Sequence, residues 1–420
     1  MNLKTTKSKL SGDILIPASK SHTIRAVAIA GMADGKSILR KSLISADAFS
    51  CINGVKEFGA LIDQNNELII TGINGLINPV CKKVDVGNSG TTLRILTAMA
   101  ALAHHPIIFD GDDSIRKRPM TPLLSALKDL GADINSTYDK CPFTIKGPLK
   151  GGKTTVDGIS SQFLTALLLA CPLAKDDTEI SVENLHEKPY VEITLDWLKS
   201  QSIQFENRGL DWFKIKGLQK YKAYERDIPA DFSSATFPLC AAAITGSEVL
   251  IKGLDFSDHQ GDKEIFLFLE KMGAKITYTD KGVIVKGDKL HGTEIDMNAT
   301  PDALPALAVV GCFAKGKTSL LNVAQARLKE CDRIKAMATE LRKMNAAVEE
   351  LEDGLIIKES ELTGTDVNGY DDHRMVMALA IAGMASEGET VIDSAESINI
   401  TYPSFIEDMK NIGANIELIY

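Results

Sequence analysis

The chain has 420 residues, of which 44% are hydrophobic and 25% are charged, proportions that are ordinary for a soluble globular protein. This length exceeds what one hydrophobic core usually serves, so we expect at least two domains. The formal net charge of −9 argues against a general nucleic-acid binder, which would carry a broad basic surface. The longest apolar run, around residues 163–174, is too short to span a bilayer.

The N-terminus and the cysteines bear on the cellular compartment. Residues 1–4 lead into no apolar signal core, and no spacing of His, Cys or Asp side chains resembles a metal site. We therefore expect a cytoplasmic monomer without a metal or a cofactor. The cysteines form an odd, scattered set without a Cys-x-x-Cys pair, which is typical of reduced, mostly buried thiols: Cys51, Cys81, Cys141, Cys171, Cys240, Cys312 and Cys331.

The chain repeats one unit six times at a spacing of about 70 residues, which predicts a single supersecondary unit used many times. In each copy a helix end runs into a strand, at residues 55–62, 127–134, 198–205, 269–276, 341–348 and 409–416. Each copy also has an alanine-rich, apolar helix that begins after a polar cluster, at residues 19–21, 88–90, 160–162, 231–234, 301–302 and 371–374.

Strands complete each copy. Period-2 alternation with β-branched residues predicts them at residues 143–147, 213–217, 283–287 and 355–358. The repeated unit is therefore helix, strand, helix, strand, strand, and the fold class is α/β.

The sixth copy stops mid-unit at residues 416–420, and the missing strands lie at residues 3–6 and 14–17. The simplest closure pairs the two ends of the chain in one domain. This predicts a continuous domain over residues 19–228 and a discontinuous one over residues 1–18 plus 229–420. The two crossings between the domains would form a hinge that opens and closes around a ligand.

Residues 147–154 match the GxxxxGK[ST] phosphate-loop pattern. That motif needs a helix directly after its lysine, so that backbone amides and the helix dipole meet the phosphates. Residues 154–158 are instead typical of a strand, so we reject a nucleotide loop here.

Cations accumulate where the repeat predicts helix N-termini. Lys20 and Arg25 follow the first cluster, Arg94 follows the second, and Arg374 lies in the sixth. Capping by Ser, Asn and Asp explains some clusters, but a cation at the positive end of a helix is unfavourable unless an anion binds there. Further basic segments at residues 116–119 and 327–333 extend the pattern. Together they predict ligands with several phosphates or carboxylates.

Two carboxylates, Asp302 and Glu330, lie among these cations. Asp302 could be a helix cap, and Glu330 could form an ordinary ion pair. Nearby cations keep a carboxylate ionised, so a general-acid role would require burial or a proton relay.

In order along the chain, these clusters resemble the 5-enolpyruvylshikimate-3-phosphate synthase family over nearly the whole length. The resemblance is carried by residues 17–25, 87–94, 116–119, 157–163, 188–190, 301–303, 327–333 and 372–375. It implies a two-domain inside-out α/β barrel of six βαβαββ repeats, three per domain, with the active-site cleft between the domains. It also implies that the enolpyruvyl group of phosphoenolpyruvate is transferred to the 5-hydroxyl of shikimate 3-phosphate through a tetrahedral addition–elimination intermediate, releasing phosphate.

By the same resemblance, Asp302 accepts the hydroxyl proton, and Glu330, together with Lys20, protonates the methylene carbon. The residues that would hold shikimate 3-phosphate are Lys20, Ser21, Arg25, Ser160, Ser161, Gln162, Tyr190, Asp302, Gln325 and Lys329. Those that would hold phosphoenolpyruvate are Lys20, Gly90, Arg118, Gln162, Arg333, His373 and Arg374.

Two positions depart from the family pattern. Ile400 stands where the family usually has a lysine that reaches phosphoenolpyruvate, and Glu187 stands where it often has a phosphate-binding serine. Because a carboxylate would repel a phosphate, we expect Glu187 to point away from that subsite.

Two alternatives remain open from sequence. An enolpyruvyl transferase that acts on UDP-N-acetylglucosamine would be expected to have a loop cysteine near residues 114–120, and none is present. A non-catalytic anion-binding homologue would need neither a base nor an acid, whereas Asp302, Glu330 and Lys20 are all retained.

Overall fold

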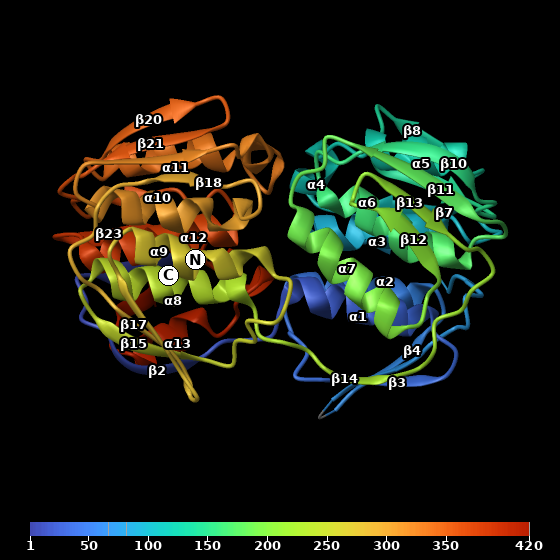
Figure 1. The fold of residues 1–420 in the computed structure, drawn as a ribbon, viewed down its shortest axis with the longest axis horizontal. Helices are drawn as coiled ribbons and strands as arrows, with labels where there is room; N and C mark the ends of the chain where they lie inside the picture. Colours follow the sequence, from blue (N-terminus) through green and yellow to red (C-terminus); the bar gives the residue numbers. More distant parts are fainter. Residues whose placement is uncertain (66, 81, 420) are drawn as a thin grey trace. The chain divides into compact units, whose positions relative to one another are not determined.

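The computed structural model describes residues 1–65, 67–80 and 82–419 (Figure 1). The chain divides into two compact units. Unit 1 comprises Met1–Pro17 and Ala230–Tyr420, and unit 2 comprises Ala18–Pro229.

Unit 2 contains three consecutive copies of the repeat. Its helices are α1 (Lys20–Met32), α2 (Ala46–Glu57), α3 (Gly90–Ala100), α4 (Asp113–Lys117), α5 (Thr121–Asp129), α6 (Ser161–Ala170), η1 (Cys171–Leu173, a 3-10 helix) and α7 (Lys188–Ser200). Its strands are β3 (Lys36–Arg40), β4 (Leu61–Gln64), β5 (Leu68–Thr71), β6 (Lys83–Asp85), β7 (Ile107–Asp110), β8 (Asp133–Thr137), β9 (Lys140–Lys146), β10 (Gly152–Asp157), β11 (Thr178–Glu183), β12 (Phe205–Arg208), β13 (Trp212–Ile215) and β14 (Glu225–Asp227).

Unit 1 contains the other three copies. Its helices are α8 (Phe232–Ile244), α9 (Glu264–Lys271), α10 (Leu304–Phe313), α11 (Arg333–Lys343), α12 (His373–Ala385) and α13 (Phe405–Asn411), with 3-10 helices η2 (Gly261–Lys263), η3 (Pro301–Ala303), η4 (Ala324–Leu328) and η5 (Ala395–Ile400). Its strands are β1 (Asn2–Thr6), β2 (Ser11–Leu15), β15 (Glu248–Lys252), β16 (Lys275–Thr279), β17 (Gly282–Lys286), β18 (Glu294–Asp296), β19 (Lys317–Leu321), β20 (Ala347–Leu351), β21 (Gly354–Lys358), β22 (Asp366–Val367), β23 (Glu389–Ile392) and β24 (Asn415–Ile419).

The described residues form six four-stranded sheets, three in each unit. Every sheet has one parallel pair followed by two antiparallel pairs, as in the order β14-β3-β5-β4. In four of these six sheets the parallel pair is connected through a helix, and in five of the six the last two strands form a hairpin. The predicted unit of helix, strand, helix, strand, strand is confirmed, as in α6-β11-α7-β12-β13.

The ends of the chain meet in unit 1. Strand β1 lies between β23 and β24 and is antiparallel to both, which confirms the expected pairing for residues 3–6. The expectation that residues 14–17 also complete the sixth copy was wrong, because β2 pairs with β15 in another sheet. At the two crossings the first strand of a repeat is exchanged. Strand β2 precedes α1 in sequence but pairs with β15 of unit 1, whereas β14 precedes α8 but pairs with β3 of unit 2.

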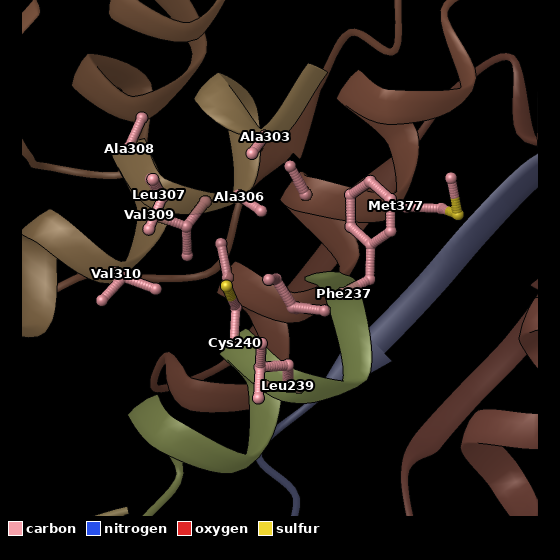
Figure 2. Packing of buried hydrophobic residues seen from close by; sticks show 14 of the residues in the cluster. Phe237, Leu239, Cys240, Ala303, Ala306, Leu307, Ala308, Val309, Val310 and Met377 are labelled. Atoms are coloured by element: carbon pink, nitrogen blue, oxygen red, sulfur yellow. The ribbon is translucent and has the colours of Figure 1, made fainter. Parts of the chain in front are cut away.

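One helix from each repeat is buried on all sides. All eleven residues of α3 are buried, and it packs against α6 in unit 2. In unit 1 the helices α8, α10 and α12 pack against one another, with Phe237, Leu307 and Met377 among the contacting side chains (Figure 2). A helix that is apolar all round must be covered on every face, so the sheets lie outside these helices. Each of these buried helices begins at one of the polar clusters. The packing of the helices therefore also holds the clusters in place.

Three smaller expectations can be compared with the fold. The phosphate-loop pattern at residues 147–154 runs into strand β10, so its rejection is confirmed. Six cysteines are free thiols, five of them buried, while Cys81 lies outside the described residues. Within the described ranges, the structure has no helix long and apolar enough to cross a membrane.

Candidate active site

Lys20 occupies the first position of α1 in unit 2. Its ammonium lies 3.2 Å from Asp47 Oδ2, and both side chains are largely buried. Asp47 belongs to the first turn of α2, which Ser45 caps. Sequence reasoning did not identify Asp47, because no motif links it to Lys20. The pair holds the ammonium at the start of α1, where a ligand anion would find both the lysine and the helix dipole.

Arg25 lies one turn further along α1 and is only 2% exposed. Its guanidinium donates to the hydroxyls of Thr194 and Thr165 and to the carbonyls of Ser21 and Tyr190 at 2.9–3.3 Å. All of these acceptors are uncharged. Burial therefore lowers the pKa of Arg25 to about 10. The guanidinium is held rigidly by α1, α6 and α7 and would gain from a carboxylate or phosphate.

The start of α6 brings together three predicted residues. Ser160 caps the helix by accepting from Gln162 N, and Ser161 and Gln162 form the first turn. Glu187 does not point away as expected. Its Oε2 accepts from Ser161 N at 3.3 Å and from Ser161 Oγ at 2.8 Å. The expectation was wrong because it considered only a bound phosphate, whereas the first turn of α6 carries no acidic residue of its own and attracts a carboxylate.

The start of α3 has two guanidinium groups close to a glycine. A Cβ placed on Gly90 would lie 2.3 Å from Arg94 Nη1 and 2.7 Å from Arg118 Nη1. Arg118 is oriented by Asn88 Oδ1 at 2.8 Å and by Ser114 Oγ at 3.1 Å. A glycine at this position therefore leaves room for both guanidinium groups at the first turn of α3. Arg94 was noted as part of this cluster but was not among the predicted ligand-binding residues.

Unit 1 contains an arginine surrounded by carboxylates. Arg333 starts α11 and is 1% exposed. Its nitrogens lie 2.7 Å from Asp372 Oδ2, 2.7 Å from Asp302 Oδ1 and 2.6 Å from Glu330 Oε2. Burial alone would lower the pKa of Arg333, but the charges of Asp372, Glu330 and Asp302 raise it well above its ordinary value. The structure thus brings the predicted base and acid, Asp302 and Glu330, onto one guanidinium.

Helix α12 supplies the rest of this cluster. Arg374 Nη2 lies 3.0 Å from Asp302 Oδ2, and His373 beside it is fully buried. Asp372 caps α12 by accepting from Arg374 N at 2.8 Å. Asp372 was recognised in sequence as part of a cap but not as a partner of Arg333. Two guanidinium groups therefore hold the Asp302 carboxylate from two directions.

A fourth carboxyl group, Asp262 of η2, lies near Asp302 and was missed in the sequence. It is 3% exposed, and Ser233 Oγ on the first turn of α8 donates to its Oδ2. Its Oδ1 has no hydrogen-bond partner among the described residues. Burial, followed by the charge of Asp302, raises the pKa of Asp262 to about 7.

Three further positions of unit 1 bear on the predicted site. Gln325 of η4 is buried and donates to Asn298 O at 3.1 Å. Lys329 follows η4 and is partly exposed. Ile400, the last residue of η5, is 9% exposed, so an apolar side chain fills the position where the family usually has a lysine.

Over nearly its whole length, the chain is similar to known proteins. A family model described as EPSP synthase (3-phosphoshikimate 1-carboxyvinyltransferase) matches residues 4–409. The chain is 50% identical to proteins named 3-phosphoshikimate 1-carboxyvinyltransferase from Acetivibrio thermocellus and Ruminiclostridium cellulolyticum, over at least 99% of each chain. It is 44% identical to the protein of that name from Methanocella arvoryzae, over the full length of both chains.

Solved structures give the same result at lower identity. The structure of an EPSP synthase from Acinetobacter baumannii matches with a TM-score of 0.83 and 26% identity, covering all of both chains. The fold predicted by the resemblance, with six repeats in a mixed α/β architecture, is confirmed. With a family match over nearly the whole length and relatives at 50% identity, the chain belongs to the EPSP synthase family.

Proposed function

We propose that this protein transfers the enolpyruvyl group of phosphoenolpyruvate to the 5-hydroxyl of shikimate 3-phosphate and releases phosphate. The observation that carries the proposal is Arg333, a buried guanidinium that bonds both Asp302 and Glu330. A protein that only binds anions has no use for two carboxylates at such a position. Membership of the family supports the substrates and the reaction.

The residues of unit 2 are assigned mainly to binding. Arg25 takes the ring carboxylate of shikimate 3-phosphate, and Ser160 and Ser161 take its phosphate, with Ser21, Gln162 and Tyr190 beside them. Phosphoenolpyruvate is assigned to Gly90, Arg118, Gln162 and Lys20. The support for these roles is that Arg25 has only uncharged acceptors and that two arginines crowd Gly90.

The residues of unit 1 are assigned mainly to proton transfer. Arg333 and Arg374 keep Asp302 ionised, so it can accept the proton of the 5-hydroxyl as that oxygen attacks C2 of phosphoenolpyruvate. Because the Glu330 carboxylate is paired with Arg333, the proton delivered to C3 is assigned to the Lys20 ammonium, with Glu330 as the group that passes it on, giving a tetrahedral intermediate. Loss of a proton from C3 then expels phosphate and forms the enol ether of the product. Arg333, His373 and Arg374 are assigned to the phosphoenolpyruvate side, where they stabilise charge on the departing phosphate; Gln325 and Lys329 are assigned to the acceptor.

The first test is release of phosphate from phosphoenolpyruvate by the purified protein, with and without shikimate 3-phosphate. We expect release only when both substrates are present. Binding of shikimate 3-phosphate without any release would indicate a non-catalytic homologue. Release with UDP-N-acetylglucosamine as the only acceptor would overturn the choice of acceptor.

The second test concerns Asp302. The Asp302→Asn variant keeps the size of the side chain but cannot take up the proton, so turnover should fall by about 10³-fold. The matched control is Asp366→Asn, an exposed aspartate in β22 of the same unit, which should retain normal turnover. Near-normal turnover of Asp302→Asn would remove Asp302 from the role of base.

We also propose that the protein is cytoplasmic, supported by the free thiols among its described cysteines, and that it is a monomer. Sedimentation equilibrium at working concentration tests the oligomeric state.

A further inference from the structure

Glu187 lies in the connection between β11 and α7, and its side chain reaches the first turn of α6. It is 2% exposed, and its Oε2 accepts from both the amide and the hydroxyl of Ser161. A helix N-terminal amide and a neighbouring hydroxyl are the donors that a phosphate also uses. Here a carboxylate of the protein itself takes these donors.

The backbone of Glu187 is fixed on both sides. Its φ is +55°, in the left-handed region, and its carbonyl accepts from Tyr190 N at 3.0 Å. The preceding residue, His186, donates its amide to Gly158 O at 3.0 Å. A non-glycine residue in this conformation persists only where its surroundings hold it. Any change at this position on ligand binding therefore falls to the Glu187 side chain, which can rotate about its χ angles.

Carboxylate and phosphate oxygens cannot both accept the single proton of the Ser161 amide. Their charges also repel at hydrogen-bonding distances, and the repulsion is strong where water is excluded. A dianionic phosphate competes for the helix N-terminus better than a carboxylate does, whereas an uncharged hydroxyl competes worse. A ligand with a phosphate can thus displace Glu187, and one with only a hydroxyl leaves it in place.

We propose that Glu187 is an internal competitor for the phosphate of the acceptor, so that it lowers the affinity for shikimate 3-phosphate without changing the affinity for unphosphorylated shikimate. This rests on the proposed function, in which Ser161 binds that phosphate. Glu187 is then an affinity-determining residue at a position where the family often has a serine.

The experiment is calorimetric titration of the intact protein and its Glu187→Gln variant with shikimate 3-phosphate and, separately, with shikimate. Glutamine keeps the size of the side chain and removes its charge, so its hydrogen bonds to Ser161 are weaker and easier to displace. We expect the Kd for shikimate 3-phosphate to fall by about 5- to 10-fold and the Kd for shikimate to stay within about twofold.

The same titrations are made with a second variant and with a control. Glu187→Ser removes the long side chain and should also tighten binding of shikimate 3-phosphate. Glu192→Gln, at an exposed position of the adjoining helix α7, should bind both ligands as the unmodified protein does. Unchanged or weaker binding of shikimate 3-phosphate by both Glu187 variants would overturn the inference and show that Glu187 supports Ser161.

A failure of the inference can be told from a failure of the proposed function. If the unmodified protein releases phosphate with both substrates present but the Glu187 variants gain no affinity, only the inference is overturned. If the unmodified protein neither binds shikimate 3-phosphate nor releases phosphate, the proposed function fails and the inference fails with it.

Discussion

Arg25 in unit 2 and Arg333 in unit 1 are both almost fully buried, yet their surroundings are opposite. Arg25 donates only to hydroxyls and carbonyls, and burial lowers its pKa to about 10. Arg333 is enclosed by three carboxylates, which raise its pKa despite its burial. A buried charge needs compensation. The difference supports the proposal that Arg25 binds a ligand anion, whereas the charge of Arg333 is compensated by carboxylates of the protein itself.

The largest change in stability is expected for the Arg333→Met variant. Removing the guanidinium leaves Asp372, Glu330 and Asp302 close together without their shared partner, so we expect the free energy of unfolding to fall by about 3–5 kcal/mol at pH 7. Urea titration followed by circular dichroism measures it. A loss below about 1 kcal/mol, typical of an exposed pair, would contradict the central role given to Arg333.

The second prediction concerns the ionisation of Asp262 in unit 1. The pKa of Asp262 is raised to about 7 by burial and by Asp302, with Arg374 acting in the opposite direction and Ser233 and Asp231 also facing the group. Between about pH 4, the ordinary pKa of an aspartate, and about pH 7, the folded state keeps a proton on Asp262 that the unfolded state has lost. Stability contributed by this proton is therefore complete at low pH and is lost as pH rises through 7.

The Asp262→Asn variant should remove this pH dependence. We expect its unfolding free energy to exceed that of the unmodified protein at pH 8 by a few kcal/mol, and the two to converge toward pH 4. Urea titrations across this range measure the difference. Asp255→Asn, at an exposed position before η2, is the matched control and should follow the unmodified protein. Parallel curves for Asp262→Asn and the unmodified protein would show that folding does not raise the pKa of Asp262.

The smallest effect is expected for Arg25→Met, the counterpart of Arg333→Met. This change removes hydrogen bonds to four uncharged acceptors but also removes an uncompensated buried charge. We therefore expect the unfolding free energy to change by only about 1–2 kcal/mol. The same urea titration measures it. If Arg25→Met destabilised the protein as much as Arg333→Met, the contrast between the two arginines would be lost.

The repeats, the strands and the polar clusters at helix starts could be found in the sequence, while several side chains that contact those clusters could not. Periodicity indicated α6 and β13, and capping residues marked the starts of α3 and α12. Asp47 and Asp262 carried no motif, because their importance comes from the side chains that fold against them. The prediction that Glu187 points away was wrong for the same reason, because its orientation depends on a contact with Ser161, which is 26 residues away.

The sequence by itself determined the repeat, the class of each element and the polar clusters at helix starts, because periodicity and capping act within one or two turns of the chain. The tertiary structure decided which sheet receives β2 and β14, and which arginine is compensated. Arg25 meets Thr194 at a separation of 169 residues, and Arg333 meets Asp302 and Asp372 at separations of 31 and 39. Electrostatic environments are set by such distant neighbours and by burial, so they emerge only when the chain is folded.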